Sequence, residues 1–197
     1  MSGMRQLRAW LRAMRLHQWA KNLLLFIPAL GAHRLLEPAT LTTALLSFLW
    51  FGLVASGTYM VNDLLDVESD RQHPRKRLRP FAAGDLGMRA GWSVAALLVV
   101  GAFAGAVLTL HPMFAGVLAL YLVGTLWYSK TLKGIAMVDV LTLAGLYTLR
   151  LIAGAAAVQV VPSFWLLAFS MFMFLGLAII KRYTELRAVL QAGNHTA

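Results

Sequence analysis

Residues 41–60 read LTTALLSFLWFGLVASGTYM, twenty consecutive positions without a charged side chain. A stretch of about 20 apolar residues is long enough to cross the roughly 30 Å hydrocarbon core of a bilayer as an α-helix. The whole chain of 197 residues has the same character, because 59% of its residues are hydrophobic, 13% are charged and the mean hydropathy is +0.69. Too few polar side chains remain to coat a water-soluble domain. The composition therefore predicts an integral membrane protein.

Other apolar runs lie on both sides of this stretch, and the first of them is the shortest and most polar. We predict an all-α, polytopic transmembrane bundle of about six spans, formed by residues 1–197 as a single domain. The predicted spans cover residues 19–33, 41–60, 89–110, 112–129, 137–158 and 162–180. Ahead of them, residues 4–16 set apolar side chains at helical spacing among arginines, which is typical of a helix lying in the membrane surface. We expect no removable signal peptide, because no cleavage site follows the basic N-terminus.

Nearly all of the 18 Lys and Arg residues fall in connections that an even number of spans places on one side of the membrane. Cytoplasmic connections are enriched in Lys and Arg, so we expect both termini and the long connection 61–88 to be cytoplasmic. In a bacterium this corresponds to the inner membrane. This topology explains the net charge of +10 without any nucleic-acid partner; the expected environment is membrane lipid.

The connection 61–88 begins within YMVNDLLDVESDRQHPRKRLRPFAAG (residues 59–84), where Asn62, Asp63, Asp66 and Asp70 follow at spacings of one, three and four. If the preceding helix continues past Asn62, the three aspartates lie on one face over two turns, where like charges repel. A Mg²⁺ ion that keeps several waters and bridges to substrate phosphates would neutralise such a cluster. The spacing favours a catalytic metal–diphosphate site with the three aspartates as ligands and Asn62 beside the substrate.

A dense basic segment follows the aspartates directly. Arg71, Arg77 and Arg79 are candidates for holding phosphate oxygens through bidentate contacts. The alternative is that the carboxylates and the basic residues pair with one another in a solvated loop, as most mixed charge runs do. On spacing alone both interpretations stay open, and the position of the segment at a membrane surface favours the metal and phosphate site.

Three charged residues within or beside the apolar runs are further candidates. Lys21, at the start of the first run, is a candidate catalytic phosphate contact, and its alternative is a lysine that reaches toward lipid head groups. Asp139 and Arg150 are eleven residues apart on one run and share a helix face. Ionisable residues within spans usually face the bundle interior, so we predict substrate-binding roles for both, with structural pairing between helices as the alternative.

The Asn62-Asp63-x-x-Asp66-x-x-x-Asp70 motif resembles the first aspartate motif of the UbiA-type superfamily of intramembrane transferases. The resemblance continues over nearly the whole chain and is greatest to the branch that contains decaprenyl-phosphate phosphoribosyltransferase. The similar segments are HQWAKN (17–22), DRQHPRKRLRPFAAG (70–84), YSKTLK (128–133), LRLIAG (149–154) and KRYTEL (181–186).

The resemblance implies a helical bundle, usually of nine spans, in which the aspartates bind Mg²⁺ and a diphosphate leaves the substrate. Lys133, in the YSKTLK segment, is then a substrate-binding candidate. Glu185 is a candidate for a second carboxylate near the metal and the substrate, and its alternative is an ordinary pair with Lys181 four residues earlier. Because we predict only about six spans, we expect either a partial bundle or an additional chain that completes it.

The resemblance also defines the expected reactions. The first is transfer of a phosphoribosyl group from its pyrophosphate to a polyprenyl phosphate. The second is transfer of an isoprenoid from a polyprenyl diphosphate to an aromatic or other small acceptor. In both, negative charge develops on the departing diphosphate, where metal and arginine stabilise it. A non-catalytic membrane subunit that binds lipid phosphates is the alternative from a different class.

Overall fold

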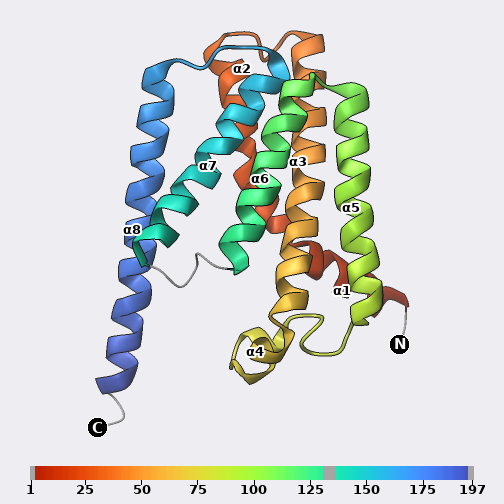
Figure 1. The fold of residues 1–197 in the computed structure, drawn as a ribbon, viewed down its shortest axis with the longest axis vertical. Coiled ribbons are helices and arrows are strands. Elements are labelled where there is room, and N and C mark those ends of the chain that lie inside the picture. Colours follow the sequence, from red (N-terminus) through yellow and green to blue (C-terminus); the bar gives the residue numbers. More distant parts are fainter. Residues whose placement is uncertain (1–2, 131–135, 195–197) are drawn as a thin grey trace.

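The computed structural model describes residues 3–130 and 136–194, and every regular element in these ranges is helical (Figure 1). In chain order the α-helices and 3₁₀ helices are α1 (Gly3–Met14), η1 (Leu16–Phe26), α2 (Ile27–Gly31), α3 (Pro38–Leu65), α4 (Val67–Gln72), η2 (Lys76–Leu78), α5 (Met88–Thr109), α6 (Pro112–Lys130), α7 (Ala136–Val158) and α8 (Phe164–Asn194).

Five helices are long and apolar enough to cross a membrane, and they correspond to the second to sixth predicted runs. These spans are Pro38–Leu65, Met88–Thr109, Pro112–Lys130, Val138–Val158 and Phe164–Thr184. Pro38 and Pro112 occupy the first helical position of α3 and α6, where a missing backbone N–H costs nothing. The prediction of an all-α, polytopic membrane bundle is confirmed.

The first predicted run, residues 19–33, has a different structure from the other five. It forms most of η1, an eleven-residue 3₁₀ helix, followed by the five-residue α2. Pro28 has no N–H to donate within α2, and 3₁₀ stretches this long are uncommon. The segment nevertheless packs against α3 and α7 and runs beside them from the upper end of the bundle in Figure 1 to the C-terminal end of α1.

The predicted connection 61–88 is helical at its start, because α3 continues past Asn62 to Leu65. The helix then breaks at Asp66, whose backbone angles (φ −92°, ψ 5°) separate α3 from α4. Asp70 therefore lies on α4 and not on a continuation of α3. The three aspartates do not form one stripe along a single helix, in contrast to the stacking that their spacing predicts.

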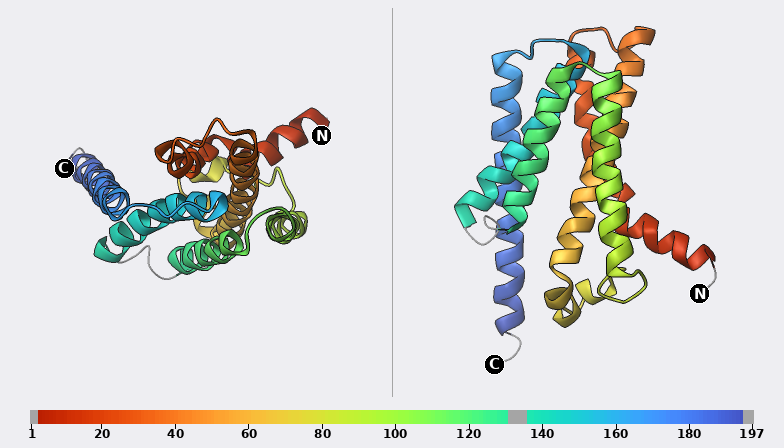
Figure 2. Two further views of the ribbon diagram at one scale, coloured as in Figure 1. Left: turned by 90° about the horizontal axis from the view of Figure 1, so that it is seen from above. Right: turned by 45° about the vertical axis from the view of Figure 1, so that its right-hand side comes forward.

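The helices are arranged as an open bundle around α3 and α7. Helix α3 packs against η1, α5, α6 and α7, whereas α8 packs mainly against α7. Helix α4 and the C-terminal ends of α6 and α8 lie at the same end of the bundle (Figure 1). At that end the amphipathic α1 projects sideways from the bundle (Figure 2), with Leu7 and Leu11 exposed and Ala9 and Ala13 buried. This confirms the helix predicted over residues 4–16.

The backbones of η1 and α7 approach each other closely at Gly154. A Cβ atom at this position would lie 2.1 Å from the carbonyl oxygen of Leu25, which is fully buried. Only glycine allows the two segments to come this close. Gly145, on the same helix, has nothing within 4 Å of the corresponding position.

We expect Gly154→Ala to separate η1 from α7 and to destabilise the bundle by about 1–3 kcal/mol, the usual cost of overpacking a core. Gly145→Ala is the matched control, because it makes no clash and alanine favours a helix by roughly 0.5–1 kcal/mol over glycine. Thermal unfolding in detergent micelles measures both effects. Equal stability of the two variants would contradict the close approach of Leu25 and Gly154.

Candidate functional site

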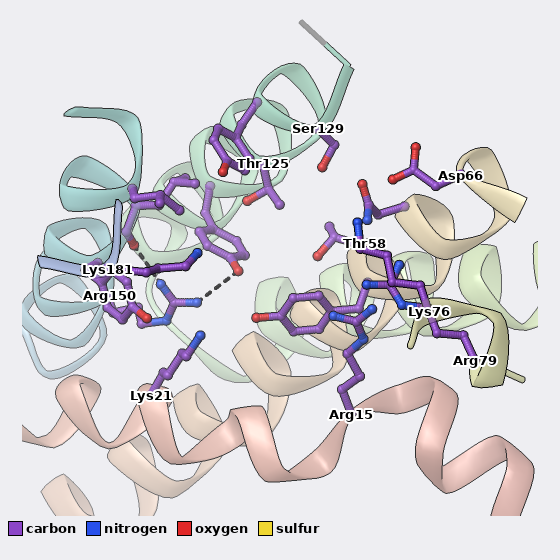
Figure 3. A pocket seen from close by; sticks show the side chains of 17 residues that line it. Arg15, Lys21, Thr58, Asp66, Lys76, Arg79, Thr125, Ser129, Arg150 and Lys181 are labelled. Carbon is purple, nitrogen blue, oxygen red and sulfur yellow. Dashed lines mark hydrogen bonds between the residues drawn. The ribbon is translucent and has the colours of Figure 1, made fainter. Parts of the chain in front are cut away.

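A cavity of about 380 Å³ lies between η1, α3, α6 and α7, and residues of η2 and α8 also line it (Figure 3). Most of its lining residues have polar side chains although its helices are apolar, so the bundle directs these side chains inward. The lining residues are Arg15, Lys21, Thr58, Tyr59, Asn62, Asp66, Lys76, Arg79, Tyr121, Thr125, Tyr128, Ser129, Leu143, Leu146, Tyr147, Arg150 and Lys181.

The charges on this wall are strongly unequal. Six of the described lining residues carry a positive charge, and Asp66 is the only carboxylate among them. The cations are Arg15, Lys21, Lys76, Arg79, Arg150 and Lys181. Such a surface inside a low-dielectric bundle attracts an anion far more strongly than the same charges would in water. The cavity is therefore built to take a negatively charged group.

Asp63 and Asp70 are buried in a network of arginine ion pairs. Asp63 Oδ1 accepts a hydrogen bond from Arg15 Nη2 at 2.6 Å and lies 3.1 Å from Arg79 Nη1. Arg79 Nη1 also donates to Asp70 Oδ2 at 2.7 Å. Asp63 is 2% exposed and Asp70 1%, and neither is among the residues that line the cavity. The alternative left open by the sequence was pairing with the following basic segment in a solvated loop; the structure instead has buried pairs, with Arg79 of that segment and with Arg15 from outside it.

Arg15 owes its position to an unusual backbone conformation. Its φ of 50° and ψ of 48° place it in the left-handed region, which few residues other than glycine adopt. This conformation turns the chain from α1 into η1 and brings the guanidinium to Asp63 and over the Tyr59 ring, 5.1 Å from its centroid. Backbone strain of this kind is concentrated at functional sites.

Arg150 is held on the opposite side of the cavity by neutral groups. Its Nε donates to Asn22 Oδ1 at 3.2 Å, Nη1 to the Leu146 carbonyl at 2.8 Å and Nη2 to the Tyr121 hydroxyl at 3.1 Å. The guanidinium also lies 5.0–5.4 Å from the ring centroids of three aromatic side chains. Arg150 is only 4% exposed. A charge buried this deeply is costly unless an anion or aromatic faces compensate for it.

The other predicted residues differ in their relation to the cavity. Lys21, Asn62 and Asp66 line the cavity, and Asp66 supplies the carboxylate of the described lining. Asp139 is buried behind the wall, where it accepts a hydrogen bond from the Tyr128 hydroxyl, so its contact with the cavity is indirect.

Two predicted arginines lie outside the cavity lining. Arg71 is exposed and pairs with Glu68 at 3.0 Å, and Arg77 is exposed on η2. Lys133 lies outside the described residues. Glu185 belongs to α8, and its side chain is also outside the described part of the structure.

Several lining residues were absent from the predicted site. On α6 these are Tyr121, Thr125, Tyr128 and Ser129, whose spacing of three to four residues forms one polar stripe on an apolar helix. Tyr147 precedes Arg150 by three residues on α7 and shares its face in the same way. That polar periodicity within an apolar run is the signal from which the sequence could have identified them.

The described residues contain no group of three or more His, Cys, Asp or Glu side chains placed to share a metal ion. A Mg²⁺ ion often takes only one or two protein carboxylates and completes its shell with waters and substrate phosphates. Asp66 and Asn62, which are four residues apart on the cavity wall, fit such a site. Asp63 and Asp70 instead fix the position of Arg79 next to this site.

Fold and site together define an integral membrane helical bundle with a cation-lined cavity. The model of the UbiA prenyltransferase family matches residues 23–196. The chain therefore belongs to the UbiA prenyltransferase family.

Similar proteins agree with this membership. The chain is 42% identical over 178 residues to the uncharacterized protein y4nM of Sinorhizobium fredii, covering 89% of this chain and 34% of that protein. It is 38% identical over 186 residues to decaprenyl-phosphate phosphoribosyltransferase of Mycobacterium tuberculosis, covering 92% of this chain and 61% of that enzyme. The chain thus spans less than two thirds of the length of these relatives.

A solved structure shows the same fold. A UbiA homolog from Archaeoglobus fulgidus, bound to GPP and Mg²⁺, superposes with a TM-score of 0.72 at 19% identity. The superposition covers 94% of this chain and 66% of that one.

We expect Asp63→Asn to destabilise the protein by roughly 2 kcal/mol, less than a fully buried pair loses because the Arg15 side chain is 23% exposed. The matched control is Asp85→Asn, which breaks the 2.7 Å pair with Arg12, whose side chain is 57% exposed; it should cost about 0–1 kcal/mol. Thermal unfolding in detergent micelles compares the two. A loss for Asp63→Asn no larger than that of the control would argue against the buried network.

Proposed function

We propose that this chain forms the substrate-binding part of a membrane transferase that takes a diphosphate-bearing donor into the cavity and acts on a polyprenyl substrate. The observation that carries the proposal is the cavity wall, with six cations and one carboxylate in a bundle otherwise suited to lipid. The reaction we favour is phosphoribosyl transfer to a polyprenyl phosphate. The decaprenyl-phosphate phosphoribosyltransferase of Mycobacterium tuberculosis, which is similar over 92% of this chain, supports this choice.

The reaction makes and breaks one bond at the ribose carbon. An oxygen of the polyprenyl phosphate forms a bond to that carbon as the bond to the diphosphate breaks, and the diphosphate leaves with the bonding electrons. Arg15 and Arg79, held by Asp63 and Asp70, are already oriented and can stabilise the developing charge without reorganisation. Mg²⁺, when bound, would supply further neutralisation of the diphosphate, with Asp66 and Asn62 as the protein groups that hold it.

The polyprenyl chain needs no specific recognition to reach the cavity. Its hydrocarbon has the chemistry of the lipid around the spans, so the protein has to bind only the charged end. Leu143 and Leu146 provide apolar wall beside the cations.

Prenyl transfer from a polyprenyl diphosphate to an aromatic or other small acceptor is the second candidate function. The Archaeoglobus homolog of the same fold, which is bound to GPP and Mg²⁺, favours it. Tyr59, Tyr121 and Tyr147 also present aromatic rings at the cavity, and such rings can stabilise an allylic cation.

Turnover by the purified protein in lipid nanodiscs with Mg²⁺ tests the proposal. Phosphoribosyl pyrophosphate plus a polyprenyl phosphate is compared with a polyprenyl diphosphate plus aromatic acceptors. We expect product from the first pair and a loss of about 100-fold or more in Asp66→Asn, as for other groups that stabilise a charged transition state. Arg89→Gln, an exposed charge change at the start of α5, is the control and should keep wild-type turnover.

Each outcome of this test has a distinct meaning. Product from the second pair alone would replace phosphoribosyl transfer by prenyl transfer. Turnover that Asp66→Asn and Mg²⁺ removal leave intact would refute the metal assignment. Absence of product from both pairs, with all variants folded, would favour a lipid-phosphate binding subunit that acts with an additional chain.

We further propose that the bundle end carrying α4 faces the cytoplasm, because the basic residues concentrate there. The chain contains no cysteine, so single-cysteine labelling has no background. Ser69→Cys on α4 should react with an impermeant thiol reagent only from the cytoplasmic side, and Leu36→Cys, 92% exposed at the other end, only from the outside. The reverse pattern would invert the proposed orientation.

A further inference from the structure

The six cations of the cavity form two groups on opposite walls (Figure 3). The loop group consists of Arg15, Lys76 and Arg79, next to Asp66. The helix group consists of Lys21 on η1, Arg150 on α7 and Lys181 on α8. Lys21 and Arg150 pack on the same ring, with the Lys21 Nζ 5.5 Å and the Arg150 Cζ 5.2 Å from the centroid of Tyr147.

The loop group is balanced by carboxylates. Arg15 and Arg79 pair with Asp63 and Asp70, and Asp66 adds a third negative charge at the same end of the cavity. Three cations and three carboxylates leave this side without net charge. A metal ion and a diphosphate, whose charges largely offset each other, suit such a neutral environment.

Two members of the helix group, Lys21 and Arg150, lack this balance. In the described part of the chain, Arg150 and Lys21 form no ion pair, and the hydrogen-bond partners of Arg150 are an amide, a backbone carbonyl and a hydroxyl. These bonds use three of the five guanidinium N–H groups, which leaves two for a ligand. The Nδ2 of Asn22, 1% exposed, is a further buried donor beside Arg150 without an acceptor. Around Lys21 and Arg150, unused donors coincide with positive charges that have aromatic neighbours but no carboxylate partner.

Uncompensated charge within a membrane bundle indicates an anion that arrives with the substrate. The charges of Lys21 and Arg150 repel a divalent metal, so this anion has to be bound by the side chains alone. A phosphate monoester carries up to two negative charges and several acceptor oxygens, which match the donors of Lys21 and Arg150. We propose that the helix group is a metal-independent subsite for a phosphate monoester, separate from the diphosphate site at the loop group.

This inference rests on the proposed function and sharpens it. Phosphoribosyl transfer to a polyprenyl phosphate brings two phosphate monoesters to the cavity besides the diphosphate, one on the sugar and one on the lipid. Prenyl transfer to an uncharged aromatic acceptor brings none. A second anion subsite therefore favours a reaction in which a phosphate monoester is a substrate group.

Binding without turnover tests the subsite. Isothermal titration calorimetry of the full chain in nanodiscs, with EDTA present, measures the affinity for ribose 5-phosphate and for farnesyl phosphate, which represent the sugar and the lipid source. We expect one of them to bind without Mg²⁺. Lys21→Gln and Arg150→Gln should each weaken this binding about tenfold or more, the effect of losing a charge-assisted contact. Asp66→Asn and the control Arg89→Gln should leave it unchanged.

The Lys21 variant keeps the test decisive if Arg150→Gln fails to fold, because Lys21 is only half-buried. Tighter binding of ribose 5-phosphate assigns the subsite to the sugar phosphate, and tighter binding of farnesyl phosphate assigns it to the lipid. Binding of neither probe, a requirement for Mg²⁺, or wild-type affinity in Lys21→Gln would overturn the inference. Metal-independent binding in a protein that gives no product would refute the proposed function and retain the subsite.

Discussion

The paired contact of Asp63 with Arg15 and Arg79 is the interaction on which the cavity depends. It joins the turn between α1 and η1, the end of α3 and the segment after η2, three parts of the chain that no other described ion pair connects. Without this carboxylate, Arg15 would have to keep its charge at the edge of an apolar bundle without a counterion among the described ion pairs, whereas Arg79 would retain Asp70. The network also fixes the direction of both guanidinium groups. One wall of the cavity is thus organised before any substrate enters.

The membrane simplifies the remaining design. A soluble transferase has to build an apolar tunnel for a long isoprenoid, whereas under the proposed function the bilayer would hold that part of the substrate. The helices can then direct their few polar residues to one interior surface, as Tyr121, Thr125 and Ser129 do on α6. The same economy explains why Arg150 and Lys181, which lie within the spans, both line this cavity.

The sequence predicted the spans well because long apolar runs have one stable solution in lipid, the hydrogen-bonded helix. It predicted Lys21, Asn62, Asp66 and Arg150, which do line the cavity, because charged or amide side chains at span ends and interiors are rare. Local spacing failed for the three aspartates, since the break at Asp66 depends on where the following segment packs.

Other features were harder to predict. Which of several neighbouring arginines turns inward is decided by tertiary pairing, so Arg79 could not be distinguished from Arg71 and Arg77. The tyrosines of the wall resemble the aromatic residues that line any membrane interface, and only their spacing with other polar residues on α6 and α7 sets them apart. The contact between these two helices brings them to one cavity.

The 3₁₀ geometry of η1 has a mechanical consequence. A 3₁₀ helix rises about 2.0 Å per residue and an α-helix 1.5 Å, so η1 and α2 together extend about 30 Å, the thickness that normally takes 20 α-helical residues. The segment therefore covers this thickness with fewer residues than an α-helix needs. Relaxation of η1 into an α-helix would shorten it by roughly 5 Å and rotate Lys21 and Asn22 away from Arg150. The position of Lys21 and Asn22 relative to Arg150 is therefore set by the 3₁₀ pitch of η1.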